Sequence, residues 1–259
     1  MMRRAHCSGR SEIAAPHIET LAITASTNAD MLVRAGQGEA EGLWLRAEAQ
    51  QAGRGRMQRN WASPPGNLYI STIIRLRQGE PAPATLALVA GLAFHDSAAH
   101  WLGVAVPRLK WPNDLLVDQA KMGGILLERS GDAVVAGFGM NITHAPDLPD
   151  RETMALNDLA RGETATAAQV AEKLATAFAA RLVMWRDPAQ GLAAIIKQWE
   201  ERGLGRGIAL AVTASDGGRL TGRFDGLAAD GSLRLRDYNG NSHIVTAGDV
   251  DLLTGTGKN

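Results

Sequence analysis

Residues 106–141 read VPRLKWPNDLLVDQAKMGGILLERSGDAVVAGFGMN, and this stretch decides the fold. It contains four short runs of aliphatic and β-branched residues, at 106–111, 115–117, 124–128 and 133–138. Turn residues separate the runs, namely Pro112-Asn113-Asp114, Asp118-Gln119 and Ser130-Gly131-Asp132. Runs of this length with turns of this kind are typical of strands that follow one another in a sheet. The stretch therefore predicts consecutive short strands.

The residues on either side add helices and further strands to this group. Strands are predicted at 17–24, 42–47 and 67–76, and Ser26-Thr27-Asn28 offers capping side chains for a helix that begins near Met31. Residues 84–101 are rich in Ala and Leu without an internal Pro, which predicts a buried helix. A helical stripe at 170–185 and a helix at 192–201 follow, so residues 15–204 are predicted to form a mixed β-sheet flanked by helices.

The sequence pattern changes at about Gly205, from helical segments to short strand-like runs. Short strands are predicted at 208–213, 220–226, 232–236 and 244–246. They are separated by Asp216-Gly217, Asp230-Gly231 and Asn239-Gly240, which are strong hairpin signals. Leucines 233 and 235 alternate with arginines 234 and 236, so one face of that strand is expected to contact water. Residues 205–259 therefore predict a small β-barrel next to the α+β domain.

Composition excludes several classes of protein. Of the 259 residues, 45% are hydrophobic and 21% are charged, which is ordinary for a globular chain. The 27 basic residues balance 27 acidic ones, so no net field favours nucleic acid or an anionic membrane. A single cysteine, Cys7, excludes an internal disulfide. No run is long and apolar enough for a membrane helix, and no secretory segment follows Met1, so we expect a cytoplasmic protein.

The segment 50–61 reads QQAGRGRMQRNW and concentrates positive charge on a pliable backbone. Its glycines permit close approach to a ligand, while arginine recognises phosphate or carboxylate through several donors. Trp61 at its end offers a flat face to a base. Two plainer interpretations stay open for this segment alone, a mobile solvated loop and an arm that contacts RNA.

Only five of the 27 basic residues are lysines, and two of the five lie in the strand-rich stretch. Lys110 precedes Pro112, which ends its strand and directs Lys110 and Asp114 out of the end of the sheet. Lys121 precedes a diglycine and a buried strand, where a fixed ammonium suits a small anion. Each pattern also fits a plain turn or hairpin with an exposed lysine.

One further pattern bears on the same site. Gly137 and Gly139 lie two residues apart in a strand, which fits either a bulge or a close approach to the backbone. Taken together, the four segments predict a site for an anionic substrate and a nucleotide. No P-loop, nucleophile elbow, zincin motif or complete dinucleotide-binding glycine motif is present, and the six histidines show no metal-ligand spacing, so no protein-held metal is predicted.

Four blocks in this order resemble the biotin–protein ligases. They are Gly53-Arg54-Gly55-Arg56-x-x-Arg59-x-Trp61, Lys110-Trp111-Pro112-Asn113-Asp114, Lys121-x-Gly123-Gly124-Ile125-Leu126-x-Glu128 and Gly137-x-Gly139-x-Asn141, with Ser26-Thr27-Asn28 upstream. The resemblance implies the catalytic fold that these ligases share with class II aminoacyl-tRNA synthetases, followed by an SH3-like barrel.

The resemblance also implies a two-step reaction. Biotin is activated by ATP, with Mg2+, as biotinyl-5′-AMP, and is then transferred to a lysine of a biotin carboxyl carrier protein domain of acetyl-CoA carboxylase. By match to the motifs, the expected biotin-binding residues are Ser26, Thr27, Asn28, Gln50, Gly53, Arg54, Gly55, Arg56 and Lys121. The expected ATP-binding residues are Arg56, Arg59, Trp61, Lys110, Asn113, Lys121 and Asn141. The expected catalytic residues are Lys121, Arg56, Lys110 and Asp114, and the role of Asp114, through magnesium or through the incoming amine, stays open.

The chain departs from some relatives at its N-terminus. Too few residues precede the first predicted strand for a helix-turn-helix, so we expect an enzyme that binds no DNA, with residues 1–14 as a disordered tail. A monomer and a homodimer both fit. The rival interpretations are a lipoate ligase or octanoyltransferase, a non-catalytic biotin or nucleotide sensor, and a nucleic-acid-binding module. The transferase chemistry uses a downstream cysteine nucleophile, and no cysteine follows Cys7.

Overall fold

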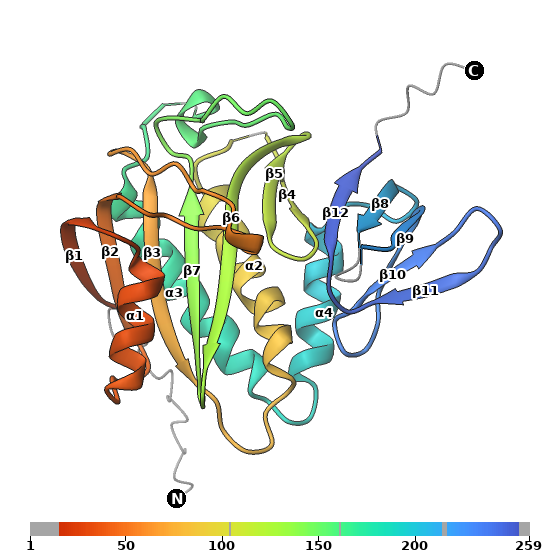
Figure 1. The fold of residues 1–259 in the computed structure, drawn as a ribbon, viewed down its shortest axis with the longest axis horizontal. Helices are drawn as coiled ribbons and strands as arrows, with labels where there is room; N and C mark the ends of the chain where they lie inside the picture. Colours follow the sequence, from red (N-terminus) through yellow and green to blue (C-terminus); the bar gives the residue numbers. More distant parts are fainter. Residues whose placement is uncertain (1–15, 104, 161, 214–216, 254–259) are drawn as a thin grey trace, which may run out of the picture.

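The computed structural model describes residues 16–103, 105–160, 162–213 and 217–253. The expected disordered tail at 1–14 lies outside these ranges. The larger of two sheets has seven strands in the order β1-β2-β3-β7-β6-β5-β4 (Figure 1). The strands are β1 His17–Thr24, β2 Leu43–Gln50, β3 Leu68–Arg75, β4 Pro107–Lys110, β5 Asp114–Val117, β6 Ala120–Ser130 and β7 Ala133–Met140. Only β1 and β2 pair in parallel, so the sheet is mixed, as predicted.

Successive side chains of β3 point to opposite faces of this sheet, and their contacts show which helices pack on each face. Ile70 and Ile74 belong to the main core with the helices α2 Leu86–Ala99, α3 Ala167–Trp185 and α4 Gly191–Arg202. Ile73 points to the other face, where it packs with Met31 of the helix α1 Thr27–Gly36. Since successive side chains of a strand point to opposite faces, Ser71 lies on the α1 face as well. Helix α1 begins at the predicted cap, where the Ser26 hydroxyl accepts a hydrogen bond from the Ala29 amide.

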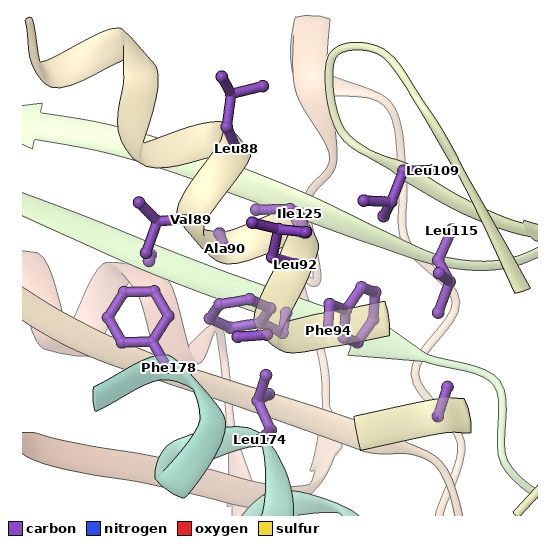
Figure 2. Packing of buried hydrophobic residues seen from close by; sticks show 14 of the residues in the cluster. Leu88, Val89, Ala90, Leu92, Phe94, Leu109, Leu115, Ile125, Leu174 and Phe178 are labelled. Atoms are coloured by element: carbon purple, nitrogen blue, oxygen red, sulfur yellow. The ribbon is translucent and has the colours of Figure 1, made fainter. Parts of the chain in front are cut away.

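Helix α2 is apolar nearly all round because it is enclosed on several sides. It contacts α3, α4 and strands of the large sheet. Figure 2 shows Leu88, Val89, Leu92 and Phe94 of α2 among side chains of α3 and of the strands. A Cβ on Gly123 would lie 2.6 Å from the Phe94 ring, so the strand needs glycine there to admit the ring. No helix in the described ranges is both long and apolar enough to cross a membrane.

The C-terminal strands form a second, antiparallel sheet in the order β11-β10-β9-β8-β12. They are β8 Ala209–Thr213, β9 Arg219–Leu227, β10 Leu233–Arg236, β11 Ser242–Val245 and β12 Asp249–Leu252. The expected wet face of β10 is present, since Leu233 and Leu235 are buried while Arg236 is exposed. The sheet agrees with an SH3-like arrangement, but its end strands β11 and β12 do not pair in the part of the chain described, so no closed barrel is seen.

Strand β12 was not predicted, and its position matters for the site. It pairs with β8 from Asp249–Thr213 to Leu252–Leu210. The C-terminal sheet also shares one continuous hydrophobic cluster with the larger domain, to which Leu210, Phe224 and Val250 contribute. The Trp111 indole donates a hydrogen bond to the Gly231 carbonyl at 3.2 Å. The two sheets are therefore joined through buried side chains and not only through the segment that links them.

Candidate active site

A cavity of about 300 Å³ lies on the α1 face of the large sheet. Its wall comes from the N-terminus of α1, the end of β2, the segment 54–61, strands β4 to β7, the loop 148–151 and strand β12. In Figure 1 the segment between β2 and β3 crosses the face of β7 toward β6. The arginine-rich segment of the sequence therefore covers the strands that carry the glycine motifs.

One end of the cavity is built from a chain of hydrogen bonds with a fixed direction. Glu128 accepts from the Asn28 amide at 2.8 Å, and the Asn28 carbonyl oxygen accepts from the Ser71 hydroxyl at 2.6 Å. The Ser71 and Thr27 hydroxyls lie 2.8 Å apart. Because Ser71 uses its proton on Asn28, the single Thr27 hydroxyl proton is shared between the Ser71 oxygen and the Gln50 side-chain oxygen, which lies 3.2 Å away. The Thr27 oxygen can then accept a hydrogen bond from a ligand N–H group.

Gln50 completes this end. Its side-chain oxygen accepts from the Thr27 backbone amide at 2.9 Å, and its nitrogen donates to the Ser63 hydroxyl at 3.1 Å. Ser63 in turn donates to the Trp61 carbonyl. A Cβ on Gly53 would lie 2.6 Å from both Ser63 and the Trp61 carbonyl, so this return of the chain requires glycine. The end of β2 is thereby connected to the arginine-rich segment.

The two glycines of β7 serve close packing, and the alternative of a bulge is wrong. The register of β7 with β6 is continuous from Gly123–Met140 to Ser130–Ala133. A Cβ on Gly137 would lie 1.9 Å from the Asn28 oxygen, and one on Gly139 would lie 2.6 Å from the Trp61 ring. The indole of Trp61 also lies 5.5 Å from the Lys121 ammonium, a cation–π distance.

The centre of the cavity holds a carboxylate between two ammonium groups. Lys121 Nζ lies 2.6 Å from one oxygen of Asp114, and Lys110 Nζ lies 3.1 Å from the other. Burial by itself would raise the pKa of Asp114, but the two lysines hold it below its usual 3.8. Burial lowers the pKa of Lys121, and Asp114 offsets this only in part. The lysine is therefore not the exposed hairpin residue of the plainer interpretation.

Residues at the start of β12 and just before it hold the segment 54–61 in place. Arg56 donates from both terminal nitrogens to the Gly248 carbonyl at 3.1 Å and contacts the Asn113 side-chain oxygen at 3.3 Å. Arg59 forms an ion pair with Asp249 at 2.5 Å. Met57 and Gln58 adopt positive φ angles of 53° and 59°, and the backbones of Arg54 and Asn60 form a bridge. The segment is thus a tight, ordered turn in this structure.

Most of the residues predicted from the sequence meet in this one cavity. Those that line it are Ser26, Thr27, Asn28, Gln50, Arg54, Gly55, Arg56, Arg59, Trp61, Lys110, Asn113, Asp114 and Lys121. Gly53 and Asn141 are buried and do not line the cavity as the structure describes it. The side chain of Asn141 instead donates a hydrogen bond to the backbone carbonyl of Lys121 at 3.5 Å.

Several lining residues were missed from the sequence. They are Asn60, Tyr69, Leu148, Asp150, Arg151, Asp249, Val250 and Asp251. Arg151 lies in a loop with prolines on its N-terminal side, and β12 is an acidic, short strand, so neither carries a motif. Among the described residues, no group of three or more His, Cys, Asp or Glu side chains could hold a metal ion.

Comparison with known proteins places the chain among relatives that match nearly its whole length. It is 38% identical over 240 residues to the biotin–[acetyl-CoA-carboxylase] ligase of Mycobacterium tuberculosis, which covers 90% of this chain and 88% of the relative. It is 37% identical over 242 residues to the same-named ligase of Paracoccus denitrificans, covering 88% of this chain and 97% of the relative. The chain belongs to the biotin/lipoate A/B protein ligase family.

The family model matches residues 22–142, which include every site residue predicted above. The biotin/lipoate ligase fold is also found by structural comparison. The biotin protein ligase of Aquifex aeolicus in complex with biotin and ATP superposes with a TM-score of 0.79 at 23% identity, covering 92% of this chain and 98% of that one. At that identity the likeness establishes the fold, including the C-terminal sheet, and the chemistry must be argued from the site.

Proposed function

We propose that this protein is an ATP-dependent biotin–protein ligase. The observation that supports it most directly is the pair of ammonium groups of Lys110 and Lys121 on Asp114, between a polar pocket at one end of the cavity and an arginine-rich cover. A carboxylate and a polyphosphate are both anions, so a site that joins them must supply positive charge where they meet. The relatives named as ligases are consistent with this chemistry.

In this proposal the ureido group of biotin occupies the pocket of Ser26, Thr27 and Gln50. Hydroxyl and amide groups there are held by partners, so they present defined donors and acceptors before the ligand arrives. The valeryl chain runs along β6 and β7, where the glycines leave the backbone open. Its carboxylate reaches Lys121, which exchanges part of its contact with Asp114 for the ligand.

The nucleotide is assigned to the other end of the cavity. Arg56, Arg59 and Lys110 face the phosphates, Asn113 and Asn141 support that wall, and the Trp61 ring offers a face for adenine. A carboxylate oxygen of biotin attacks the α-phosphorus of ATP, and the bond to the β,γ-pyrophosphate breaks. The products are the mixed anhydride biotinyl-5′-AMP and pyrophosphate. The protein contributes positioning and charge and forms no covalent bond.

The second step takes place at the acyl carbon. The ε-amine of the acceptor lysine attacks the carbonyl of the anhydride, the bond to the phosphate oxygen breaks, an amide forms, AMP leaves and the proton of the amine passes to solvent. Asp114 is ionised and accepts from two ammonium groups, so we assign it the task of spacing Lys110 from Lys121 and not that of a free base. The segment with Arg54 and Gly55 covers the anhydride and excludes water that would hydrolyse it.

Magnesium enters the proposal as part of the substrate. Asp114 is already engaged by two lysines, and the described residues contain no cluster of three or more His, Cys, Asp or Glu side chains that could hold a resident ion. Mg2+ commonly binds through substrate phosphates with few protein ligands, so we assign it to the ATP complex. The acceptor is proposed to be a biotin carboxyl carrier domain. We also propose residues 15–204 as the catalytic domain and 205–259 as its C-terminal partner, in a monomer or homodimer.

The test has two parts. Isotope exchange between pyrophosphate and ATP should depend on biotin, because only a reversible adenylation links the three compounds. Labelled biotin should then appear on a carrier domain and disappear when its acceptor lysine is replaced by arginine. Exchange that depends on lipoate or octanoate but not on biotin would assign the site to another member of the family. Binding of biotin and ATP without any exchange would make the protein a sensor.

A further inference from the structure

Residues 248–250, at and just before the start of strand β12, contact the cations of the site. The Gly248 carbonyl, just before the strand, accepts from Arg56. Asp249 pairs with Arg56 and Arg59 of the segment 54–61, and the Val250 carbonyl accepts from Lys110 at 2.8 Å. Arg56, Arg59 and Lys110 are the side chains assigned above to the phosphates of the nucleotide. Each of them is thus engaged by the C-terminal sheet in the ligand-free protein.

Of these contacts, the one with Asp249 joins charged groups on both sides, whereas the others are made to neutral backbone carbonyls. The two carboxylate oxygens of Asp249 lie 3.4 Å from Arg56 and 2.5 Å from Arg59. Its side chain is 19% exposed, whereas the Arg59 side chain is 54% exposed, so the carboxylate is placed by the fold and the arginine reaches to it. A Cβ on Gly248 would lie 2.7 Å from the Thr213 carbonyl, so β12 approaches β8 closely at this point. The carboxylate is therefore fixed in the wall of the cavity.

We propose that Asp249 is an internal anion that occupies the nucleotide-binding arginines until the phosphates of ATP displace it. This inference rests on the proposed function, since it concerns the affinity of the same site for its nucleotide. A carboxylate and a phosphate are both acceptors for the planar donors of arginine, so they compete for Arg56 and Arg59. Two anions next to each other also repel, so the bound nucleotide and the Asp249 contact disfavour one another.

The same contact gives Asp249 a positioning role before ATP arrives. Three arginines in the segment 54–59 repel each other, and a carboxylate among them keeps the segment in one arrangement across the cavity. The consequence is a lower apparent affinity for the nucleotide, because the intrinsic affinity is multiplied by the fraction of molecules in which the arginines are free. With two partly exposed ion pairs to break, we expect this factor to be about three to ten.

The chain supplies a matched control on the same strand. Asp251 also lines the cavity and carries the same charge two residues further along β12, on the same face as Asp249. No ion pair of Asp251 is seen within the described ranges. Replacing Asp251 by asparagine therefore removes a charge near the cavity and leaves the contact with the arginines in place.

The experiment compares the wild type with Asp249→Asn and Asp251→Asn. Titration with the magnesium complex of α,β-methylene-ATP, which resists cleavage at the bond broken in adenylation, should show binding about three to ten times tighter for Asp249→Asn. Asp251→Asn should change the dissociation constant by less than about twofold, through long-range charge alone. Equal or weaker binding by Asp249→Asn, or an equal gain in Asp251→Asn, would overturn the proposal.

A second measurement needs no nucleotide. Trypsin cleaves after arginine, so the ligand-free Asp249→Asn protein should be cut within 54–59 several times faster than the wild type, and Asp251→Asn should not. Unchanged cleavage would likewise contradict the contact. The variant Asp249→Ser guards against an effect peculiar to asparagine. Wild-type protein that lacks biotin-dependent exchange would refute the proposed function, whereas normal exchange with unaltered variants would refute only the role of Asp249.

Discussion

At the scale of single residues, the site is governed by one buried carboxylate and the two partly buried ammonium groups that contact it. Asp114 lies between Lys110 and Lys121. Burial alone disfavours charged ammonium groups in the cavity wall, and the carboxylate offsets this cost. An incoming carboxylate therefore finds a cation already positioned. The ammonium of Lys121 has only to redistribute its hydrogen bonds and does not have to be desolvated anew.

Replacing Lys121 by alanine should remove the proposed partner of the biotin carboxylate. We expect biotin binding to weaken by about 2–5 kcal/mol, or roughly 30-fold to several-thousand-fold, because the ligand anion would be buried without its counter-charge. Isothermal titration with biotin measures the loss. Lys173→Ala, on the far helix α3, is the control and should bind as the wild type. Equal affinities in all three proteins would show that Lys121 does not contact the ligand.

The pH dependence of biotin binding should report the same lysine. Burial lowers the pKa of Lys121 from its ordinary 10.5, so the ammonium loses its proton earlier as the pH rises. Affinity should be steady near neutral pH and should fall on the alkaline side before 10.5 is reached. In Lys121→Arg the guanidinium stays charged, and the fall should move to higher pH. A profile that is flat to 10.5 in the wild type would be inconsistent with this assignment.

Gly137 tests the close packing that places Asn28. A Cβ there would lie 1.9 Å from the Asn28 oxygen, so Gly137→Ala should displace that side chain and interrupt the chain from Glu128 to Thr27. We expect a loss of about 1–3 kcal/mol in the free energy of unfolding and weaker biotin binding. Chemical denaturation and titration measure the two effects. Gly205→Ala, where a Cβ meets nothing within 4 Å, should change neither.

At the scale of elements, the covering segment 54–61 depends on contacts with other parts of the chain. Its own sequence is rich in glycine and charge, yet it is held in one turn by Asn113, by the Gly248 carbonyl and by Asp249. A segment whose order comes from such contacts can open when they are exchanged for a ligand. This combination suits a cover that must admit two substrates and then exclude water.

Arg56→Ala should weaken that cover. Without the hydrogen bonds to Gly248 and Asn113 the anhydride should escape into solvent, where it acylates exposed lysines of other proteins. The measurement is labelling of a bystander protein with labelled biotin, in the presence of the carrier domain. We expect bystander labelling to rise while carrier labelling slows. Arg129→Ala removes the same charge from an exposed position, and if it leaks as much as Arg56→Ala the role of the cover is refuted.

The elements show where prediction from the sequence succeeds and where it stops. The hairpin signals predicted β8 to β11, and the turn residues around Pro112 predicted β4 and β5, because these signals are local. Strand β12 was missed because Asp249, Val250 and Asp251 combine strong charge with one apolar residue and gain their stability from pairing with β8. Strand β6 begins at Ala120 and not at the predicted residue 124, and Gly123 within it is required by the packing of Phe94.

The same limit applies to the site. Residues in motifs, such as Lys121 and Arg56, could be named because the residues next to them in the sequence complete a recognisable pattern. Asp249 and Arg151 could not, since they reach the cavity through tertiary packing from segments without a motif. The expected roles of Gly53 and Asn141 as direct ligands stay predictions, and in the structure both residues support a neighbour of the cavity wall.

At the scale of the whole molecule, the two sheets behave as one body. Their apolar residues form one continuous cluster, and Glu200 on α4 holds both Arg206 and the Leu227 amide. We therefore expect one cooperative thermal transition for the full chain, with calorimetric and van't Hoff enthalpies that agree. Differential scanning calorimetry measures this. Two resolved transitions would mean that the C-terminal sheet unfolds independently and that the shared cluster adds little to its stability.

The position of Trp61 has a practical outcome for kinetics. Its indole lies against the Lys121 ammonium and over Gly139, while Trp44, Trp111, Trp185 and Trp199 are buried. Trp61 and Trp111 both line the cavity, so a ligand that draws the ammonium away or slides over the Trp61 ring alters tryptophan emission directly. The protein thus carries a built-in fluorophore, and stopped-flow mixing can follow the arrival of each substrate without an attached dye.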